Sequence, residues 1–282
     1  MGRTRVIYIL GAGRSGSTML SMLLGNLDGI FNAGEVRYLF NRDLQVRDLP
    51  CSCGESVYNC VFWGDIIPKI DHSIVDNATA KLRASKVLSV FLQSDLAKQI
   101  GQVYANIASK ANVQVLIDSS KHPVYAKCLS MAPNIELRVI HLVRDPRGMV
   151  SSWSQNKEYL GRKPAWKVAL IWVLLNLLSE VLFANHPFYL RLRYEDFVEN
   201  PRKHLLSVLS FCGLDSNVDE IVDGDARFYI KRFQHILAGN PEKLKPGNVI
   251  EIRKREWKLA LRSRILTQLI TYPIARHYGY LG

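Results

Sequence analysis

Short apolar runs alternate along the chain with longer segments whose apolar positions recur at helical spacing. Four runs have the length and apolar content of buried strands, at residues 5–10, 113–117, 137–143 and 188–192. Residues 18–27 and 96–107 instead repeat apolar side chains every three or four positions, which predicts amphipathic helices. Strands that alternate with helices form parallel sheets, because the crossover helices cover the faces of the sheet. The pattern therefore predicts an α/β fold with a central parallel sheet flanked by helices.

The same alternation runs through the chain without a repeat, a low-complexity tract or a linker, so we expect one domain over residues 1–282. With 48% hydrophobic and 22% charged residues, the composition excludes disordered and fibrous classes. The first apolar run is too short for the core of a signal peptide and leads straight into glycines. We therefore expect a cytoplasmic protein.

Residues 168–184 are almost continuously apolar and approach the length of a membrane span. Glu180 opposes spanning, because a carboxylate at the bilayer centre costs about 3 kcal/mol. Asn176, Ser179 and Glu180 fall on one face of a helix. This favours a core helix, while a helix that forms an apolar substrate wall or rests on a membrane surface stays open as the alternative.

The segment Gly-Ala-Gly-Arg-Ser-Gly-Ser-Thr at 11–18 joins the first predicted strand to the first predicted helix. Backbone N–H groups and the helix dipole converge on an anion at such a junction. Arg14 adds a fork of donors, and Ser17 and Thr18 add hydroxyl groups in the first helical turn. The segment therefore predicts a loop that binds phosphate or sulfate.

Two nucleotide-binding patterns resemble this loop. It nearly matches G-x-x-x-x-G-K-[ST], but Ser17 stands where that pattern has its lysine. An ATP-dependent small-molecule kinase would thus lose the cation that reaches its transferred phosphate, so this class is the alternative rather than the first choice. The glycines also fit G-x-G-x-x-G, with Glu35 as the acidic residue, but a different role for Glu35 makes this dinucleotide pattern a weaker match.

A second motif, His-Leu-Val-Arg-Asp-Pro-Arg-Gly-Met-Val-Ser-Ser-Trp, occupies residues 141–153. Together with the loop at 11–18, it resembles the sulfotransferases that use 3′-phosphoadenosine-5′-phosphosulfate (PAPS). The resemblance is strongest to the branch with bacterial, Golgi carbohydrate and tyrosylprotein sulfotransferases. It extends over most of the chain, with further similar stretches at 51–63, 118–123, 193–201 and 235–241. The fold that it implies is a P-loop-like three-layer sandwich.

The resemblance also implies which residues bind the nucleotide. The 5′-phosphosulfate would be held by Arg14, Ser15, Gly16, Ser17 and Thr18. Arg144 and Ser152 would grip the 3′-phosphate: Arg144 stands where a strand ends and Ser152 lies one or two helical turns farther on, so both can reach one phosphate. The alternative for Arg144 is a surface ion pair with Asp145. His141 lies inside the apolar run, which favours a core histidine.

Sulfuryl transfer needs a base for the acceptor and positive charge for the leaving group. The resemblance implies that Glu35, after a short extended return that follows the first helix, is the base. It also implies that Lys121, together with Arg14, stabilises the group in transfer. Asp28 and His122 are rival candidates for the base. This chemistry requires no metal.

Lys and Arg outnumber Asp and Glu by 37 to 25, which gives a net charge of +12 and suggests an anionic partner. Residues 243–264 carry half of that excess. The resemblance implies that this segment covers the nucleotide, with a contact from Arg253, Lys254 or Arg255 and with Trp257 as the anchor. A basic protein that binds nucleic acid or an anionic membrane is the non-enzyme alternative, but it leaves the Arg144 and Ser152 pair unexplained. We expect no nucleic-acid partner.

The five cysteines are irregularly spaced, which argues against a disulfide framework and fits a reducing compartment. Cys51, Cys53 and Cys60 are clustered, but a structural zinc site needs four ligands and no fourth stands nearby in the sequence. We therefore expect no metal site.

These observations predict a PAPS-dependent sulfotransferase that acts on a hydroxyl or amine group of a small-molecule, glycan or lipid acceptor. Four aromatic residues are candidates for the acceptor site: Trp153, Tyr159, Trp166 and Trp172. Neither the acceptor nor the oligomeric state follows from the sequence.

Overall fold

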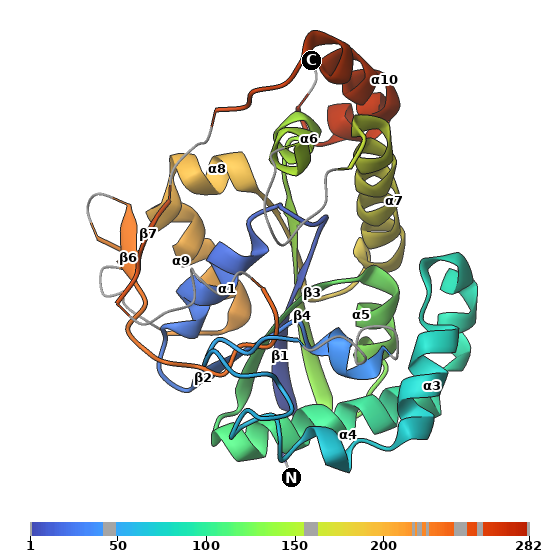
Figure 1. Cartoon of the computed structure of the whole chain (residues 1–282), viewed down its shortest axis with the longest axis vertical. Coiled ribbons are helices and arrows are strands. Elements are labelled where there is room, and N and C mark those ends of the chain that lie inside the picture. Colours follow the sequence, from blue (N-terminus) through green and yellow to red (C-terminus); the bar gives the residue numbers. More distant parts are fainter. Residues whose placement is uncertain are drawn as a thin grey trace.

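The computed structural model describes residues 2–41, 49–154, 163–215, 218, 222–223, 226–239, 247–252 and 256–280. Its centre is a five-stranded parallel sheet with the strand order β2-β3-β1-β4-β5 (Figure 1). The strands are β1 (Thr4–Leu10), β2 (Ile30–Gly34), β3 (Val115–Lys121), β4 (Ile135–Val143) and β5 (Tyr189–Arg193). The predicted α/β fold with a central parallel sheet is confirmed, and the extended return before Glu35 is the edge strand β2.

Helices connect and cover these strands. The α-helices of the described residues are α1 (Ser17–Gly25), α3 (His72–Lys81), α4 (Ser94–Ala111), α5 (Pro123–Ser130), α6 (Pro146–Ser154), α7 (Ala165–Phe183), α8 (Tyr194–Glu199), α9 (Pro201–Cys212) and α10 (Leu261–His277). The 3₁₀ helices are η1 (Val36–Phe40), η2 (Ile67–Lys69) and η3 (Ala84–Leu92). A small antiparallel pair, β6 (Arg227–Tyr229) and β7 (Val249–Glu251), lies apart from the main sheet (Figure 1).

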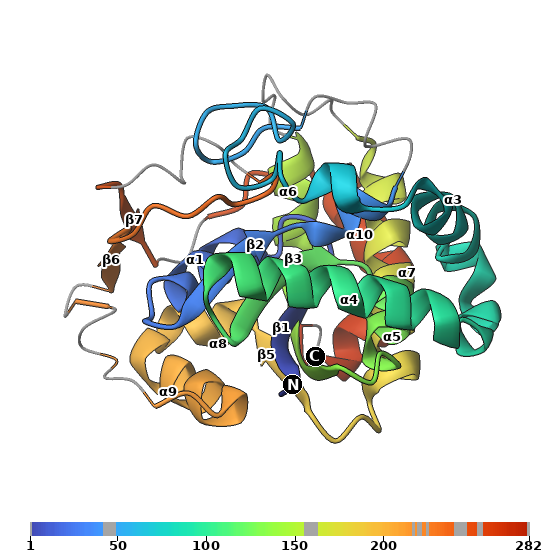
Figure 2. The same cartoon turned by 90° about the horizontal axis from the view of Figure 1, so that it is seen from below.

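Alternate side chains of β1 enter different cores, as the pleat of a buried strand requires. Val6, Tyr8 and Leu10 belong to the core that also holds the buried faces of α4 and α5. Ile7 and Ile9 belong to the core formed with α1 and α9. Figure 1 shows α1, α8 and α9 on one side of the strands and α5 and α7 on the other, while Figure 2 shows α4 crossing the molecule beside the N-terminus. The molecule is thus a sandwich of helix, sheet and helix.

Helix α7 contains most of the long apolar segment. Among the described residues it is the one helix with the length and composition of a membrane span. About a third of its most apolar 18-residue stretch is buried in the protein. Its polar face points inward: Asn176 Oδ1 lies 2.8 Å from His141 Nε2, and the Ser179 side chain is fully buried. Tyr189 OH lies 2.7 Å from the other ring nitrogen of His141. The prediction of a core helix therefore holds for the inward face of α7. His141 is a buried core histidine that contacts this face.

The opposite face of α7 is apolar and exposed. Its exposed large side chains are Trp166, Leu170, Leu174, Leu177 and Val181. Helix α10 packs beside α7 and also leaves apolar side chains at the surface, including Leu261 and Leu269.

The carboxyl ends of the five parallel strands lie at one edge of the sheet. β1 lies in the middle of the sheet between β3 and β4, so the connections from its two sides diverge at this edge. Such a switch point is where open α/β sheets bind their ligands. Four predicted site residues stand at this edge: Arg14 after β1, Glu35 after β2, Lys121 at the end of β3 and Arg144 after β4.

Candidate functional site

The loop after β1 can be built only with glycine at two positions. Gly11 has φ +138°, and a Cβ there would lie 2.4 Å from the Leu142 carbonyl oxygen of β4. Gly16 has φ +98° and caps α1, and a Cβ there would lie 2.6 Å from the ring of Tyr194. Side chains are excluded at both positions by sterics and by the left-handed backbone. The loop therefore lies close against β4 and Tyr194.

Several donors in this loop have no partner. Within the described part of the chain, no side chain caps the N-terminus of α1, and Arg14 Nε and Ser15 Oγ are buried without a hydrogen bond. A buried polar group without a partner costs about 1–3 kcal/mol. Ser17 is buried and Thr18 half-buried in the first turn of the helix. Unsatisfied donors beside a helix N-terminus fit an anion such as a phosphate or a sulfate.

Lys121 and Glu35 meet beside this loop. Lys121 pairs in register with Leu10, the last residue of β1, and Glu35 directly follows β2. The Lys121 Nζ atom lies 2.7 Å from Glu35 Oε1, and both side chains are 16% exposed. Lys121 has a left-handed backbone with φ +65°, and its Nζ donates a 2.6 Å hydrogen bond to the Ser119 carbonyl. The strand ends thus place a cation and a carboxylate together, next to the glycine-rich loop.

Asp118 supports this turn, a role that the sequence analysis did not assign. The carboxylate is fully buried and accepts hydrogen bonds from Tyr104 OH and from the Ser120 N–H at 2.8 Å. Ser120 Oγ in turn accepts the Arg37 N–H at 3.0 Å. Burial raises the pKa of Asp118 to about 6. The buried position of Asp118 is hard to predict from the sequence. Its hydrogen-bond partner Tyr104 lies on a different element, α4, and only folding brings the two together.

Arg144 joins the second motif to the loop. Its Nη1 donates a 2.8 Å hydrogen bond to the Arg14 carbonyl, and its guanidinium stacks 4.6 Å from the Tyr194 ring centroid. Ser152 is half-buried in α6, the helix that follows Arg144. The Asp145 carboxylate is bound by the Arg147 guanidinium at 2.6–3.2 Å. The motif around Arg144 is therefore in direct contact with the motif around Arg14.

The C-terminal segment docks on α6 beside Arg144. A Cβ on Gly148 would lie 3.1 Å from Trp257 Nε1 and 3.3 Å from Arg144 Nε. The Arg147 guanidinium stacks on the Trp257 ring at 4.8 Å, and the Lys258 N–H donates to Ser151 Oγ at 3.2 Å. Trp257 is thus an anchor next to Arg144. The other candidate contacts, Arg253, Lys254 and Arg255, lie outside the described residues, as do residues 243–246.

The two rival bases differ from Glu35 in their surroundings. Asp28 is exposed and forms an ion pair with Arg232. His122 caps α5 by accepting the Tyr125 N–H at its Nδ1 atom, 3.2 Å away, and burial lowers its pKa to about 3. Asp28 is therefore a surface residue, and His122 is a neutral capping residue.

The wall of a cavity of about 190 Å³ includes chain neighbours of Glu35 and Lys121. Arg37 in its wall is two residues after Glu35, and His122 directly follows Lys121. The rest of the wall is formed by Phe40, Asn41, Ala78, Thr79, Leu82, Arg83 and Tyr125. The wall thus combines two arginines with aromatic and aliphatic side chains.

The described aromatic residues among the four acceptor-site candidates have different surroundings. Trp172 is fully buried and donates its indole N–H to the Arg144 carbonyl at 2.9 Å. Trp166 is half exposed on the outer face of α7. The Trp153 ring centroid lies 5.9 Å from Arg14 Cζ and 3.9 Å from Lys163 Nζ, so the ring contacts a residue of the glycine-rich loop. The fourth candidate, Tyr159, lies outside the described residues.

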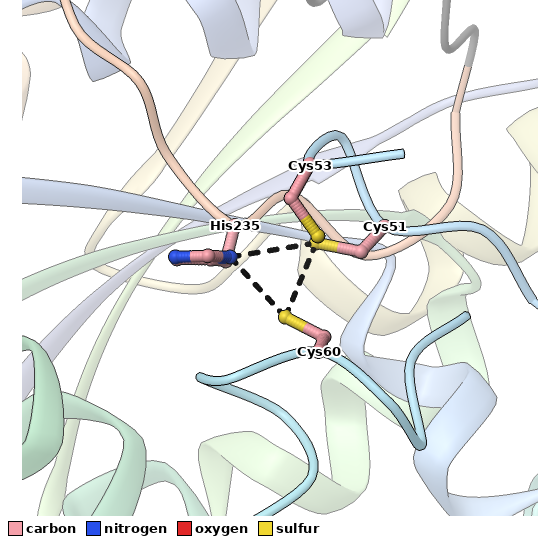
Figure 3. A group of neighbouring side chains, drawn as sticks. All are labelled: Cys51, Cys53, Cys60 and His235. Carbon is pink, nitrogen blue, oxygen red and sulfur yellow. Dashed lines mark hydrogen bonds between the residues drawn. The ribbon is translucent and has the colours of Figure 1, made fainter. Parts of the chain in front are cut away.

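The expectation that the cysteine cluster lacks a fourth ligand is corrected by the structure. His235, which is 175 residues after Cys60 in the sequence, brings its Nδ1 atom to 3.2 Å from Cys60 Sγ (Figure 3). The four ligand atoms of Cys51, Cys53, Cys60 and His235 lie within 4.8 Å of one another. The sequence could not show this, because chain folding brings His235 to the loop.

Comparisons with known proteins identify the relatives of this fold. A model described as "Sulfotransferase family" matches residues 6–220. The sulfotransferase domain of an olefin synthase from Synechococcus PCC 7002 is 21% identical, with a TM-score of 0.54 over 99% of this chain and 96% of that one. The sulfotransferase domain of the curacin biosynthetic pathway is also 21% identical, with a TM-score of 0.58 over all of both chains. No curated protein matches the chain.

Proposed function

The chain belongs to the sulfotransferase family, and from this premise we propose that it transfers a sulfuryl group from PAPS to a hydroxyl or amine group of an acceptor. The acceptor class proposed is a small molecule, a glycan or a lipid. The observation that carries the proposal is the Lys121–Glu35 pair at 2.7 Å, set beside the anion-binding loop at the carboxyl edge of the sheet.

The residues at this edge fit the two charged ends of PAPS. Arg14, Ser15 and the N-terminus of α1 offer donors that lack partners within the described structure, as a phosphosulfate site requires. Arg144 and Ser152 would hold the 3′-phosphate, with Trp257 docked beside them. When bound, PAPS supplies an activated sulfuryl group and a nucleotide leaving group.

Glu35 acts as the base in this proposal. Its carboxylate takes the proton from the acceptor hydroxyl or amine as that group attacks. The Lys121 ammonium and the Arg14 guanidinium face the negative charge that develops during transfer. Because Lys121 contacts Glu35 directly, one side chain orients the base and also contributes positive charge to the reaction.

The acceptor reaches Glu35 through the cavity lined by Arg37 and Arg83. Its wall includes Arg37 and His122, which are close in the chain to Glu35 and Lys121. Its volume of about 190 Å³ suits a small group or the end of a longer molecule. Two arginines favour an acceptor that carries an anionic group near its reactive hydroxyl. Phe40, Leu82 and Tyr125 would contact its apolar part.

We propose a cytoplasmic location, supported by the five free cysteines, which suit a reducing compartment. The exposed apolar face of α7 supports a peripheral contact with a membrane. The positive charges of the proposed site, on Arg14, Lys121 and Arg144, would bind the anionic groups of PAPS. The proposal therefore includes no nucleic-acid partner.

Sulfuryl transfer from PAPS leaves 3′-phosphoadenosine-5′-phosphate (PAP) as the product nucleotide. Binding of PAP tests the proposal without knowledge of the acceptor. Isothermal titration calorimetry should show saturable binding of PAP to the purified protein and much weaker binding of ATP. Tighter binding of ATP with magnesium than of PAP would contradict the proposal and favour a kinase.

A further inference from the structure

Three cysteines and one histidine, outside the reaction site, converge on a common point. Cys51 and Cys60 are buried, and Cys53 and His235 are half-buried. Figure 3 shows the three sulfur atoms and the His235 Nδ1 atom facing one another, on a loop and a segment far apart in the sequence. We propose that Cys51, Cys53, Cys60 and His235 bind one zinc ion, as a structural site.

The distances fit tetrahedral zinc. Zinc bonds of about 2.3 Å to sulfur and about 2.0–2.1 Å to nitrogen place two sulfur ligands about 3.8 Å apart and sulfur and nitrogen ligands about 3.6 Å apart. Cys51 Sγ and Cys60 Sγ are 3.6 Å apart. His235 Nδ1 lies 3.8 Å from Cys51 Sγ and 3.2 Å from Cys60 Sγ. These three distances are therefore close to those of a zinc tetrahedron, and Cys53 Sγ lies within 4.8 Å of the other three ligand atoms.

Tight turns of the loop present the cysteines. The Cys51 N–H donates to the Glu55 carbonyl at 2.9 Å, and the Gly54 N–H donates to the Cys51 carbonyl at 3.0 Å. Gly54 has φ +93°, so this turn between Cys53 and Glu55 depends on glycine. The turn that begins at Cys60 is closed by a 2.7 Å hydrogen bond from the Gly64 N–H to the Cys60 carbonyl.

A hydrogen bond and two ring contacts hold His235 in place. Trp63 Nε1 donates a 2.7 Å hydrogen bond to the His235 carbonyl. The Phe62 ring is stacked on the His235 ring with an interplanar angle of 8°, and the Phe233 ring meets it edge-on. These contacts fix the backbone and the ring orientation of His235, which a metal ligand needs.

The ligand set selects zinc and a structural role. Three thiolates and one imidazole suit zinc among the common divalent ions, and a Cys₃His set fills all four positions. No position is left for a substrate or a water molecule, so the ion would not take part in sulfuryl transfer. The site is independent of the proposed reaction and goes beyond it.

The zinc would fasten the segment around His235 to the edge of the sheet. Two residues after His235, the Leu237 N–H donates to the Ala33 carbonyl at 3.1 Å. The Leu237 carbonyl accepts the Glu35 N–H at 2.9 Å. A Cβ on Gly34 would lie 2.2 Å from that carbonyl oxygen, so the contact is close. The ion would thereby help to position the backbone of Glu35.

Metal analysis of the tag-free protein, purified without chelators from zinc-supplemented cells, tests the site. Inductively coupled plasma mass spectrometry should find about one zinc per chain. Cys60→Ser and His235→Ala should each bind less than about a fifth of that amount. Cys212→Ala and His204→Ala, which change a cysteine and a histidine outside the cluster, should keep the full amount.

A second measurement holds even if the cluster variants fail to fold. Cobalt-substituted wild-type protein should show the visible bands of tetrahedral Co²⁺ and thiolate-to-cobalt charge transfer in the near ultraviolet. Wild-type protein that contains no zinc and gives no such spectrum with cobalt would overturn the proposal, as would a disulfide between Cys51 and Cys60 in freshly purified protein. Neither readout uses a nucleotide or an acceptor, so failure of the zinc site and failure of the sulfotransferase proposal are separate results.

Discussion

Lys121 Nζ and Glu35 Oε1 lie 2.7 Å apart at the ends of the adjacent strands β3 and β2. The two residues are 86 positions apart in the chain, and only the parallel pairing of β2 with β3 brings them together. The pair lies beside Leu10, from which the glycine-rich loop departs. A carboxylate and a cation are therefore in place at the edge where the nucleotide is proposed to bind.

Glu35→Gln should lower kcat by about 100-fold or more, because it removes a general base and keeps the shape of the side chain. PAP affinity should stay within about twofold of the wild-type value, since Glu35 faces the acceptor. Steady-state kinetics and calorimetry measure the two quantities, with the exposed Glu199→Gln as the control. Full activity of Glu35→Gln would remove Glu35 as the base.

Arg144→Ala should weaken PAP binding by about 10- to 100-fold, the usual loss for a charged hydrogen bond to a phosphate. Adenosine 5′-phosphosulfate lacks the 3′-phosphate, so its affinity should change much less. Lys203→Ala, an exposed lysine on α9, is the control. An equal loss for both nucleotides would place Arg144 away from the 3′-phosphate.

Gly16→Ala should destabilise the fold by about 2 kcal/mol or more, since it adds a left-handed backbone penalty to a clash with Tyr194. Gly29→Ala is a matched control: Gly29 has φ +72° and open space around it, so only the backbone penalty applies. Urea denaturation measures both variants. If the two lose the same stability, the loop is not packed against Tyr194 as described.

Asp118 should make the protein less stable as the pH rises. Burial raises its pKa from 3.8 to about 6, so between about pH 4 and pH 6 the folded chain holds a proton that the unfolded chain has lost. This contribution is fully present below pH 4 and is lost as the pH passes 6. Asp118→Asn, which has no proton to lose, should not show the loss.

Urea denaturation of both proteins at pH 4.5 and pH 7 isolates this effect from other carboxylates. The free energy of unfolding of the wild type, relative to Asp118→Asn, should fall between the two pH values. A constant or rising difference would mean that Asp118 is ionised in the folded protein throughout.

Arg83→Ala should raise the KM for an anionic acceptor by about 2- to 5-fold, because the arginine is partly exposed to water and screened. The KM for PAPS should stay unchanged. Lys81→Ala, a nearby change outside the cavity wall, is the control. An effect on PAPS rather than on the acceptor would assign the cavity to the nucleotide.

The sequence predicted the fold and the glycine-rich turn between β1 and α1 because both depend on local patterns. The run at 5–10, the glycines at 11–16 and the helix that follows are adjacent in the chain, so their arrangement is nearly determined by it. Strand β2 was predicted only as an extended return, since Asn32, Ala33 and Gly34 lack the branched side chains of a typical strand.

The contacts that depend on chain folding could not be predicted. The hydrogen bond from Tyr104 to Asp118, the docking of Trp257 on α6 and the approach of His235 to the cysteines each join segments that local periodicity does not connect. Similarly, the polar residues Asn176 and Ser179 of α7 are buried while apolar residues such as Leu174 are exposed, and only packing shows that the apolar face is left uncovered.

The central claim is that the edge holding Glu35, Lys121 and the Arg14 loop transfers a sulfuryl group. Its most direct test is incubation of the protein with sulfur-labelled PAPS and an extract of the host's metabolites, followed by chromatography of the labelled products. Wild-type protein should transfer label to an acceptor in the extract, and Glu35→Gln, at equal PAP binding, should not. Absence of any labelled product with wild-type protein that binds PAP, or equal labelling by both proteins, would contradict the account.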